Sequence, residues 1–321
     1  MINIALKRQI GMLQKFADSL QIPLENGKLT IPSEKGKGYL KGLLLDNGFG
    51  IMIRNYELYE DMLVVKRGDT DASDRIIINF TNIFFDNKGD ENELTAKDLP
   101  TVQIGKGKID LDMLIPKRTK YRTILLGIDK SRLKELLGEQ HGLLIYDEIL
   151  NTEHHLLFEE VITPRIQKVA NEIIECDVPV NLQNTYYRIK AEEIVCLLFA
   201  ELFKRENSPL QNLNEDDVLM LYKIRDKILQ KLDVPPLLSE LANLARMSES
   251  KLKKLFKQIF GNSIYNYYQS FRMKEAARLL KEKKVTVSEV GYQLGFTNMS
   301  HFGKIFEEHI GMKPKKYSKN S

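Results

Sequence analysis

The sequence predicts an α+β protein in which an N-terminal antiparallel β-barrel or sandwich is followed by long helices and an all-α C-terminal domain. Three observations support this fold class. Short apolar or alternating runs separated by Gly, Asn and Asp fill about residues 28–129, longer runs with apolar residues three and four apart follow, and no strand pattern appears after about residue 215. A chain of 321 residues is long enough for two or three domains.

The strand-like runs define an N-terminal domain at residues 1–150, which is the predicted effector-binding domain. They follow each other directly, which favours antiparallel pairing over alternating βαβ units: KLTI, GYLKGLLL, FGIMIRN, DMLVVKRG, RIIINFTNIFF, TVQIGKGKIDL and YRTILLGID. Arg54, in the run GIMIRNYELY, is a candidate to meet an anionic group of a bound small molecule. The alternative, favoured from the sequence alone, is that Arg54 faces solvent from an edge strand.

Two long helices are expected next, within a helical pair at residues 151–207. HHLLFEEVITPRIQKVANEIIE and TYYRIKAEEIVCLLFAELFKRE each run about twenty residues with apolar positions three and four apart. Their apolar faces have two candidate partners, the β-rich domain or a second copy of the chain. The pair is therefore a candidate dimerisation element.

A polar segment with a proline, NSPLQNLNEDD, is the strongest boundary signal in the chain. We expect a linker and connecting helix at 208–236 and the last domain at 237–321. Its helices are expected at about 215–232, 237–244, 248–260, 263–283, 287–294 and 298–310. Ser248 and Asn298 occupy N-cap positions, and Gly261 and Gly311 occupy C-terminal stop positions.

The net charge of +4 is divided unevenly along the chain. From residue 215 onward there are 20 Lys and Arg against 12 Asp and Glu, a net +8, which leaves 28 against 32, a net −4, for the first 214 residues. A basic domain joined to a mildly acidic one is typical of nucleic-acid binders, although basic surfaces also occur without that role.

An internal repeat with an offset of 50 residues lies in the basic part. SESKLKKLFKQIFG and NMSHFGKIFEEHIG share their apolar pattern, and each follows a short helix with a small residue, Ala242 or Gly291, where two helices cross closely. A helix-turn-helix uses its second helix in the DNA major groove, so that helix needs one apolar stripe and one exposed polar face. The repeat predicts two such motifs.

Both second helices have these two faces. At 100° per residue, the buried side holds Leu252, Leu255, Phe256 and Ile259 in the first copy and Phe302, Ile305, Phe306 and His309 in the second. The outward side carries residues able to reach phosphates or base edges, although an outward lysine on a helix is often simply solvated: Ser250, Lys251, Lys253, Lys254 and Lys257, then Ser300, His301 and Lys304.

The helix between the two copies has about 20 residues and therefore a length of roughly 30 Å. This is close to the roughly 34 Å of one DNA turn. One chain could thus place two recognition helices in successive major grooves and read a bipartite site on double-stranded DNA.

The C-terminal segment resembles the DNA-binding domain of the AraC/XylS family of bacterial transcription regulators. Three runs match at the family's spacing: Arg272, Ala276, Leu279 and Leu280; Gly295, Phe296, Ser300 and Phe302; and Phe306, Gly311, Pro314 and Tyr317. By position, the resemblance assigns base contacts to Ser250, Lys253 and Lys254 in the first helix and to Met299, Ser300, His301 and Lys304 in the second.

The resemblance also implies features outside that segment. It implies a cupin-like β-barrel followed by helices, which senses a small-molecule effector or mediates homodimerisation, and it makes RNA polymerase an expected partner of an activator. An alternative keeps the DNA-binding half and makes the N-terminal domain a dimerisation or partner-binding module with no effector.

Two departures from the family pattern weaken the second motif. Gly303 stands where the family often has a longer polar residue, and Glu307 and Glu308 stand where it usually has basic ones. Because carboxylates repel phosphates, we expect the first motif to supply most of the contact with DNA.

Other functions find little support in the sequence. The start lacks the apolar run of a secretion signal, nothing approaches the roughly 20 apolar residues of a membrane span, and two cysteines, Cys176 and Cys196, suit a reducing cytoplasm. We expect no enzyme activity, cofactor or metal, because the five histidines lie outside the strand region and the glycine-rich runs GKGYLKG and GKGK miss the phosphate-loop patterns.

Overall fold

The computed structural model describes residues 2–6, 12–66, 75–81, 100–106, 111–138, 144–151, 156–204, 215–281 and 285–319. These residues form two compact units, one ending at Glu215 and one running from Asp216 onward. The predicted boundaries at 150 and 236 stay predictions, and the one at 207 lies outside the described residues.

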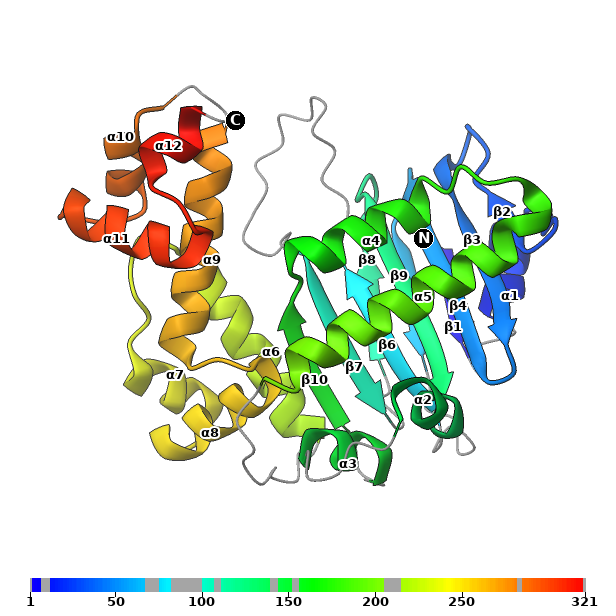
Figure 1. The fold of residues 1–321 in the computed structure, drawn as a ribbon, viewed down its shortest axis with the longest axis horizontal. Helices are drawn as coiled ribbons and strands as arrows, with labels where there is room; N and C mark the ends of the chain where they lie inside the picture. Colours follow the sequence, from blue (N-terminus) through cyan, green and yellow to red (C-terminus); the bar gives the residue numbers. More distant parts are fainter. Residues whose placement is uncertain are drawn as a thin grey trace. The chain divides into compact units, whose positions relative to one another are not determined.

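The N-terminal unit is built on a seven-stranded antiparallel sheet with the order β10-β7-β6-β9-β4-β3-β2 (Figure 1). Its strands are β2 (Lys28–Thr30), β3 (Gly36–Asp46), β4 (Phe49–Leu58), β6 (Arg75–Thr81), β7 (Thr101–Lys106), β9 (Tyr121–Asp129) and β10 (Leu156–Val161). β10 and β2 are the edges of this sheet and do not pair with each other. The antiparallel sheet is as predicted, but the closed cupin-like barrel is not confirmed, because the sheet is open.

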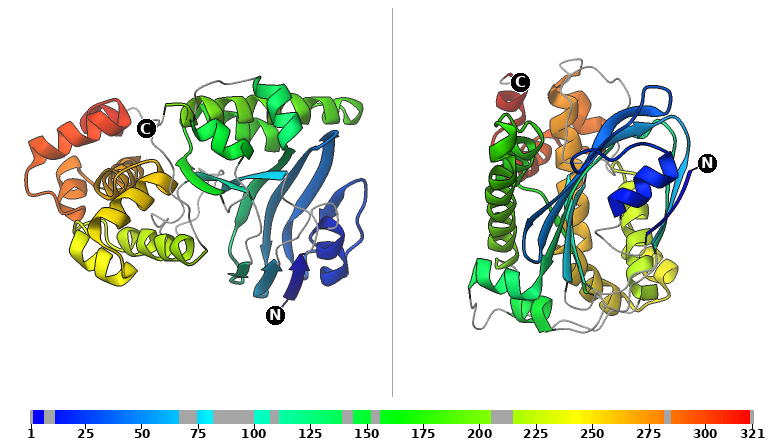
Figure 2. Two further views of the ribbon diagram at one scale, coloured as in Figure 1. Left: turned by 90° about the horizontal axis from the view of Figure 1, so that it is seen from below. Right: turned by 90° about the vertical axis from the view of Figure 1, so that its right-hand side faces the viewer.

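A second, three-stranded sheet contains β1 (Ile2–Leu6), β5 (Met62–Lys66) and β8 (Leu111–Ile115). β1 runs parallel to β5 and precedes helix α1 (Met12–Leu20). The helix lies across the seven-stranded sheet from α4 and α5 (Figure 2). Its Leu13 and Phe16 share an apolar cluster with Met52, Tyr56 and Met62. The sequence analysis did not identify β1 or α1.

Helices cover the other face of the large sheet. These are α4 (Pro164–Ile174) and α5 (Val180–Leu202), with the shorter α2 (Lys130–Leu137) and α3 (Leu144–Asn151) near one end of the strands (Figures 1 and 2). Alternate residues of β4, β6 and β9, such as Ile53, Ile78 and Leu126, join the inward residues of α4 and α5 in the largest apolar core of this unit. The helical pair therefore packs on the sheet through one face.

One of the two predicted long helices is wrong in its first part. The segment from Leu156 to Val161 is strand β10, and the helix starts only at Pro164. Proline favours the first helical turn, and the Thr163 hydroxyl accepts a hydrogen bond from the Ile166 amide as an N-cap. The residues before this cap form a strand that pairs with β7, and no local sequence pattern indicates that pairing.

The C-terminal unit is all helical among its described residues, as predicted. It contains α6 (Glu215–Leu229), α7 (Leu238–Ala245), α8 (Glu249–Phe260), α9 (Ile264–Lys281), α10 (Val287–Gln293), α11 (Met299–Ile310) and α12 (Pro314–Lys319). Each of the six predicted helices is present within three residues of its expected bounds, and only α12 was not anticipated.

Helix α9 organises this unit. In Figure 1 it runs between the pair α7–α8 and the group α10–α12. Aromatic rings of α8 and α9 pack at one end, with Phe256 and Tyr267 centroids 5.4 Å apart. At the other end Met273 and Leu280 share a core with Val290, Phe302 and Phe306.

Candidate functional site

Helix α8 begins at a side-chain cap and presents a basic outer face. The Ser248 hydroxyl accepts a hydrogen bond from the Lys251 amide at 3.2 Å, and Gly261 ends the helix at a φ of 70°. All four predicted apolar residues of the helix are buried. The five predicted contact residues are exposed on the outer side: Ser250, Lys251, Lys253, Lys254 and Lys257.

Helix α11 is built in the same way but presents a mixed face. The Asn298 carboxamide oxygen accepts a hydrogen bond from the His301 amide at 3.0 Å, and Gly311 ends the helix at a φ of 85°. Ser300, His301 and Lys304 are exposed, whereas Met299 is partly buried and packs on the apolar core of this unit. Of the four carried-over positions, Met299 is thus the one turned toward the protein.

The turn between α10 and α11 depends on two glycines. A Cβ at Gly291 would lie 2.7 Å from the Met299 sulfur, so the two helices cross closely there, as predicted. Gly295 has a φ of +76°, and a Cβ on it would lie 1.9 Å from the carbonyl oxygen of Asp233. Only glycine fits this position without a backbone shift.

Arg272 holds the same turn from α9. Its side chain is 4% exposed, and its Nε donates to the Leu294 carbonyl at 2.7 Å while Nη2 donates to the same oxygen. The guanidinium lies 3.7 Å from the centroid of the Phe296 ring. Arg272 therefore ties α9 to the segment that enters α11.

The two outer faces differ in charge. Lys304, whose side chain is 76% exposed, has Glu308 at 4.0 Å, and Glu307 and Glu308 are both exposed. On α8, Lys251 is paired with Asp217 of α6, and Lys253 lies 4.0 Å from Glu249. Because α8 exposes four lysines whereas α11 exposes Lys304 beside Glu307 and Glu308, the α8 face carries the higher density of positive charge.

His309 departs from its predicted position. The residue was expected on the buried side of α11 but is exposed. Partial desolvation is the largest influence and lowers the pKa of the imidazole below its ordinary value, while Glu308 opposes this shift and Lys274 adds to it.

Arg54 is not on an edge strand, so the favoured sequence interpretation is wrong. It lies on β4, between β9 and β3, and is only 8% exposed. Nη2 donates to the Asn79 side-chain oxygen at 3.1 Å, and the guanidinium lies 5.2 Å from the Tyr121 ring centroid. The sequence could not reveal this burial, because it depends on which strands flank β4.

Arg54 belongs to a group of polar residues on the face of the sheet that points away from α4 and α5. We call this face the back face. The members of the group are Arg54, Tyr56, Asn79, Tyr121 and Thr123. Among the described residues, three buried atoms of this group have no hydrogen-bond partner: Arg54 Nε, the Tyr56 hydroxyl and the Thr123 hydroxyl. Each such atom costs roughly 1–3 kcal/mol if nothing binds it.

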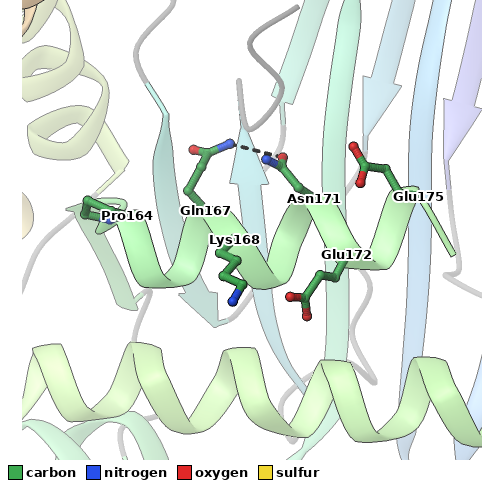
Figure 3. Close-up of a pocket in the computed structure, with 6 residues that line it drawn as sticks. All are labelled: Pro164, Gln167, Lys168, Asn171, Glu172 and Glu175. Carbon is green, nitrogen blue, oxygen red and sulfur yellow. Dashed lines mark hydrogen bonds between the residues drawn. The ribbon is translucent and has the colours of Figure 1, made fainter. Parts of the chain in front are cut away.

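A separate hollow of about 430 Å³ lies along helix α4. Figure 3 shows its lining side chains, all from this helix or its ends: Pro164, Gln167, Lys168, Asn171, Glu172 and Glu175. Gln167 and Asn171 bond to each other at 3.4 Å, and Glu172 pairs with Lys190 of α5. These polar groups already have partners, so the hollow does not resemble a built binding site.

Two features are absent from the described ranges. Within them, no group of three or more His, Cys, Asp and Glu side chains is arranged to hold a metal ion. His141, His154 and His155 lie outside these ranges. Also within them, no helix combines the length and apolar character needed to cross a membrane.

Known proteins resemble the C-terminal unit. Residues 241–320 match a family model described as a helix-turn-helix domain. Regulatory protein PchR of Pseudomonas aeruginosa is 29% identical over 124 residues, which cover 38% of this chain and 42% of PchR. The HTH-type transcriptional activator RhaR of Yersinia pseudotuberculosis is 26% identical over 155 residues, which cover 48% of this chain and 51% of RhaR.

The matched residues are those that carry the repeat and both capped helices. Residues 241–320 form an AraC-type helix-turn-helix domain. The chain spans less than two thirds of the length of either relative, and neither name describes an enzyme. A structure described as a probable AraC family transcriptional regulator from Rhodopseudomonas palustris is also similar, at 22% identity and a TM-score of 0.30, covering 32% of this chain and 96% of that one.

Sequence reasoning missed the role of four residues in the sites. Asp217 precedes the AraC-type domain in the chain and holds one of its lysines, and only the packing of α6 on α8 shows this. Arg272 was noted as a motif residue, but its bond to Leu294 was not anticipated. Tyr56 and Thr123 give no local signal, because cross-strand pairing brings them beside Arg54.

Proposed function

We propose that this protein is a DNA-binding transcription regulator of bacteria that reads two successive major-groove segments with α8 and α11. The observation that carries this proposal is the pair of capped helices, each with a buried apolar stripe and an exposed polar face at its start. Such a helix meets both demands of a recognition helix, since the stripe anchors it and the outer face reaches DNA.

The length of α9 supports reading by one chain. The helix has 18 residues, which gives about 27 Å at 1.5 Å per residue. Adjacent major-groove segments on one side of DNA lie roughly 34 Å apart. A rigid helix of this length, with a helix-turn-helix at each end, suits a bipartite site.

The contact residues follow from exposure and charge. Ser250, Lys253 and Lys254 of α8, and Ser300, His301 and Lys304 of α11, are the exposed candidates for base or phosphate contact. Lys251 and Lys257 reach phosphates, whereas Met299 contributes mainly by packing.

The function is tested by DNA binding of the full chain, with the preferred site selected from random duplexes. Lys253→Glu with Lys254→Glu should lower the affinity by at least a hundredfold, and the affinity of the unchanged chain should fall steeply with salt. Lys315→Glu with Lys316→Glu is the matched control, because it makes the same charge change on exposed residues of α12. Equal losses in the two variants, or a flat salt dependence, would contradict the proposal.

The N-terminal unit has the role of a small-molecule sensor that activates transcription through RNA polymerase in the cytoplasm. Ligand binding would shift the population of chains whose C-terminal domains can occupy adjacent sites. Arg54 is the residue proposed to bind the effector, because it is a buried charge without a carboxylate partner among the described residues. The effect of a ligand on transcription from a selected site in a purified system tests this role.

A second role, homodimerisation, is favoured by the outer face of α5. Leu182 and Ile189 are 52% and 54% exposed, and with the exposed Cys196 they follow one another at intervals of seven residues. This spacing places them on one stripe, as in helix pairs between chains. Leu182→Glu with Ile189→Glu should give monomers in sedimentation experiments, whereas Asn184→Glu with Arg188→Glu should not.

A further inference from the structure

The back face of the large sheet carries buried or half-buried polar residues on five neighbouring strands. Strand register places Thr101, Thr81, Thr123 and Arg54 in one row across β7, β6, β9 and β4. A second row lies two residues away along the strands and contains Glu159, Gln103 and Asn79 on β10, β7 and β6. Side chains alternate between the two faces along a strand, so residues two apart point to the same side and both rows belong to the back face.

Arg54 is the cationic residue of these two rows. A guanidinium keeps its charge at every physiological pH, and a buried charge is strongly disfavoured unless a counter-charge accompanies it. Arg54 has an amide oxygen and an aromatic ring as partners and forms no ion pair within the described chain. Arg132 shows the contrast, because it pairs with Asp46, Glu135 and Glu192.

The neighbouring hydroxyls supply donors for an anion. Tyr56 and Thr123 are 3% and 2% exposed, and neither hydroxyl has a partner among the described residues. Thr123 lies directly opposite Arg54 on β9, and Tyr56 lies two residues along β4 on the same face. Burial, reinforced by Tyr121, raises the pKa of the Tyr56 hydroxyl, so it stays protonated and able to donate.

The surroundings indicate what the rest of the ligand is like. The rings of Tyr56 and Tyr121 are 5.4 Å apart, and Phe16 of α1 lies 6.4 Å from Tyr56. Arg54 supplies one positive charge, which balances one negative charge on a ligand. A single negative charge with an apolar body fits this environment better than a phosphate dianion.

We propose that the back face binds the carboxylate of a small aromatic or apolar monocarboxylic acid, with Arg54 as counter-charge and the Tyr56 and Thr123 hydroxyls as hydrogen-bond donors. This inference rests on the proposed function only in making that acid the effector class, because the site itself is independent of DNA. Its binding can therefore be measured directly on the full chain.

Benzoate is the probe, and benzamide, which has a similar shape but no charge, is its matched control. Calorimetry or ligand-observed NMR should detect benzoate and not benzamide. Arg54→Met should weaken benzoate binding by about a hundredfold, and Tyr56→Phe and Thr123→Val by about tenfold each, because hydrogen bonds to charged groups have effects of this size. Arg132→Met should leave the affinity unchanged.

A second measurement needs no ligand. If Arg54 has no counter-charge until an anion binds, Arg54→Met removes an uncompensated buried charge. The melting temperature of the ligand-free chain should then rise. A lower melting temperature, with no binding of benzoate to the unchanged chain, would show that Arg54 has only a structural role and would overturn the inference. Benzoate binding that survives Arg54→Met would also overturn it.

DNA binding of the same preparations separates this inference from the proposed function. Benzoate binding without binding to any selected duplex leaves the anion site established and the proposed function wrong. DNA binding without benzoate binding would support the proposed function and contradict the carboxylate site.

Discussion

The ammonium group of Lys251 lies 3.2 Å from both carboxylate oxygens of Asp217. Lys251 belongs to the first turn of α8, whereas Asp217 belongs to α6, the helix that precedes the AraC-type domain. The lysine side chain is 46% exposed and the aspartate 15%. Lys251, which we propose to contact phosphate, is therefore paired with an acidic residue of the same chain in the absence of DNA.

Replacing Asp217 should strengthen DNA binding. Asp217→Asn removes a negative charge beside α8 and frees Lys251, and an exposed pair of this kind contributes about 0.2–1 kcal/mol. The affinity for a selected duplex should therefore rise by up to about fivefold, as measured by fluorescence anisotropy. Asp226→Asn is the control, because it changes the net charge equally on the same helix, where Asp226 pairs with Arg225. A loss of affinity in Asp217→Asn would mean that the pair positions Lys251 for contact.

Two glycines of the second helix-turn-helix should respond in opposite directions to alanine. Gly295→Ala introduces a Cβ against the Asp233 carbonyl at a positive φ, which should destabilise the unit by at least about 2 kcal/mol. Gly303→Ala adds a methyl group where no atom lies within 4 Å, inside α11, and should stabilise it by roughly 0.5–1 kcal/mol. Amide hydrogen exchange across α10 and α11 measures both effects. Equal protection in the two variants would contradict the close approach at Gly295.

Arg272 should be required for the stability of the same turn. Arg272→Met leaves the Leu294 carbonyl without its charged donor, and hydrogen bonds of this kind contribute about 1.5–3 kcal/mol. We expect faster amide exchange in residues 294–298 and weaker binding to the duplex half read by α11. Arg278→Met, on the same helix, removes an ion pair with Glu275 of a neighbouring turn and should have a much smaller effect. A similar change in both variants would argue against a specific role for Arg272.

The C-terminal domain was largely predictable because its signals are local. Caps such as Ser248 and Asn298, stops such as Gly261, and the repeat of apolar residues all act within a few turns of helix. The outward positions followed from the same periodicity. The burial of Met299 and His309 was predicted less well. Both lie near the edge of the apolar stripe, where the neighbouring helix decides whether a side chain is buried.

The N-terminal unit was less predictable because its pairings are non-local. The runs from residue 28 to 129 predicted strands. They did not indicate that β10 would join the large sheet after two helices, or that β1 would run parallel to β5. The burial of Arg54 follows from its strand having neighbours on both sides. Sheet order, rather than any feature of the run GIMIRNYELY, therefore decides whether this arginine meets solvent.

The charge difference between α8 and α11 yields the most direct test of how the two motifs share the work. Lys254 lies on a face with three other exposed lysines, whereas Lys304 has Glu308 at 4.0 Å and Glu307 nearby in the chain. Lys254→Ala should weaken binding to a duplex containing the α8 half-site by about tenfold and reduce the salt slope by about one. Lys304→Ala should weaken the α11 half-site by only about two- to threefold, because its carboxylate neighbour already offsets part of its charge. Titrations of each half-site and of the joined site, at several salt concentrations, measure both effects. A larger loss from Lys304→Ala would mean that α11 reads its groove through bases despite Glu307 and Glu308, and that α8 serves mainly as an electrostatic anchor.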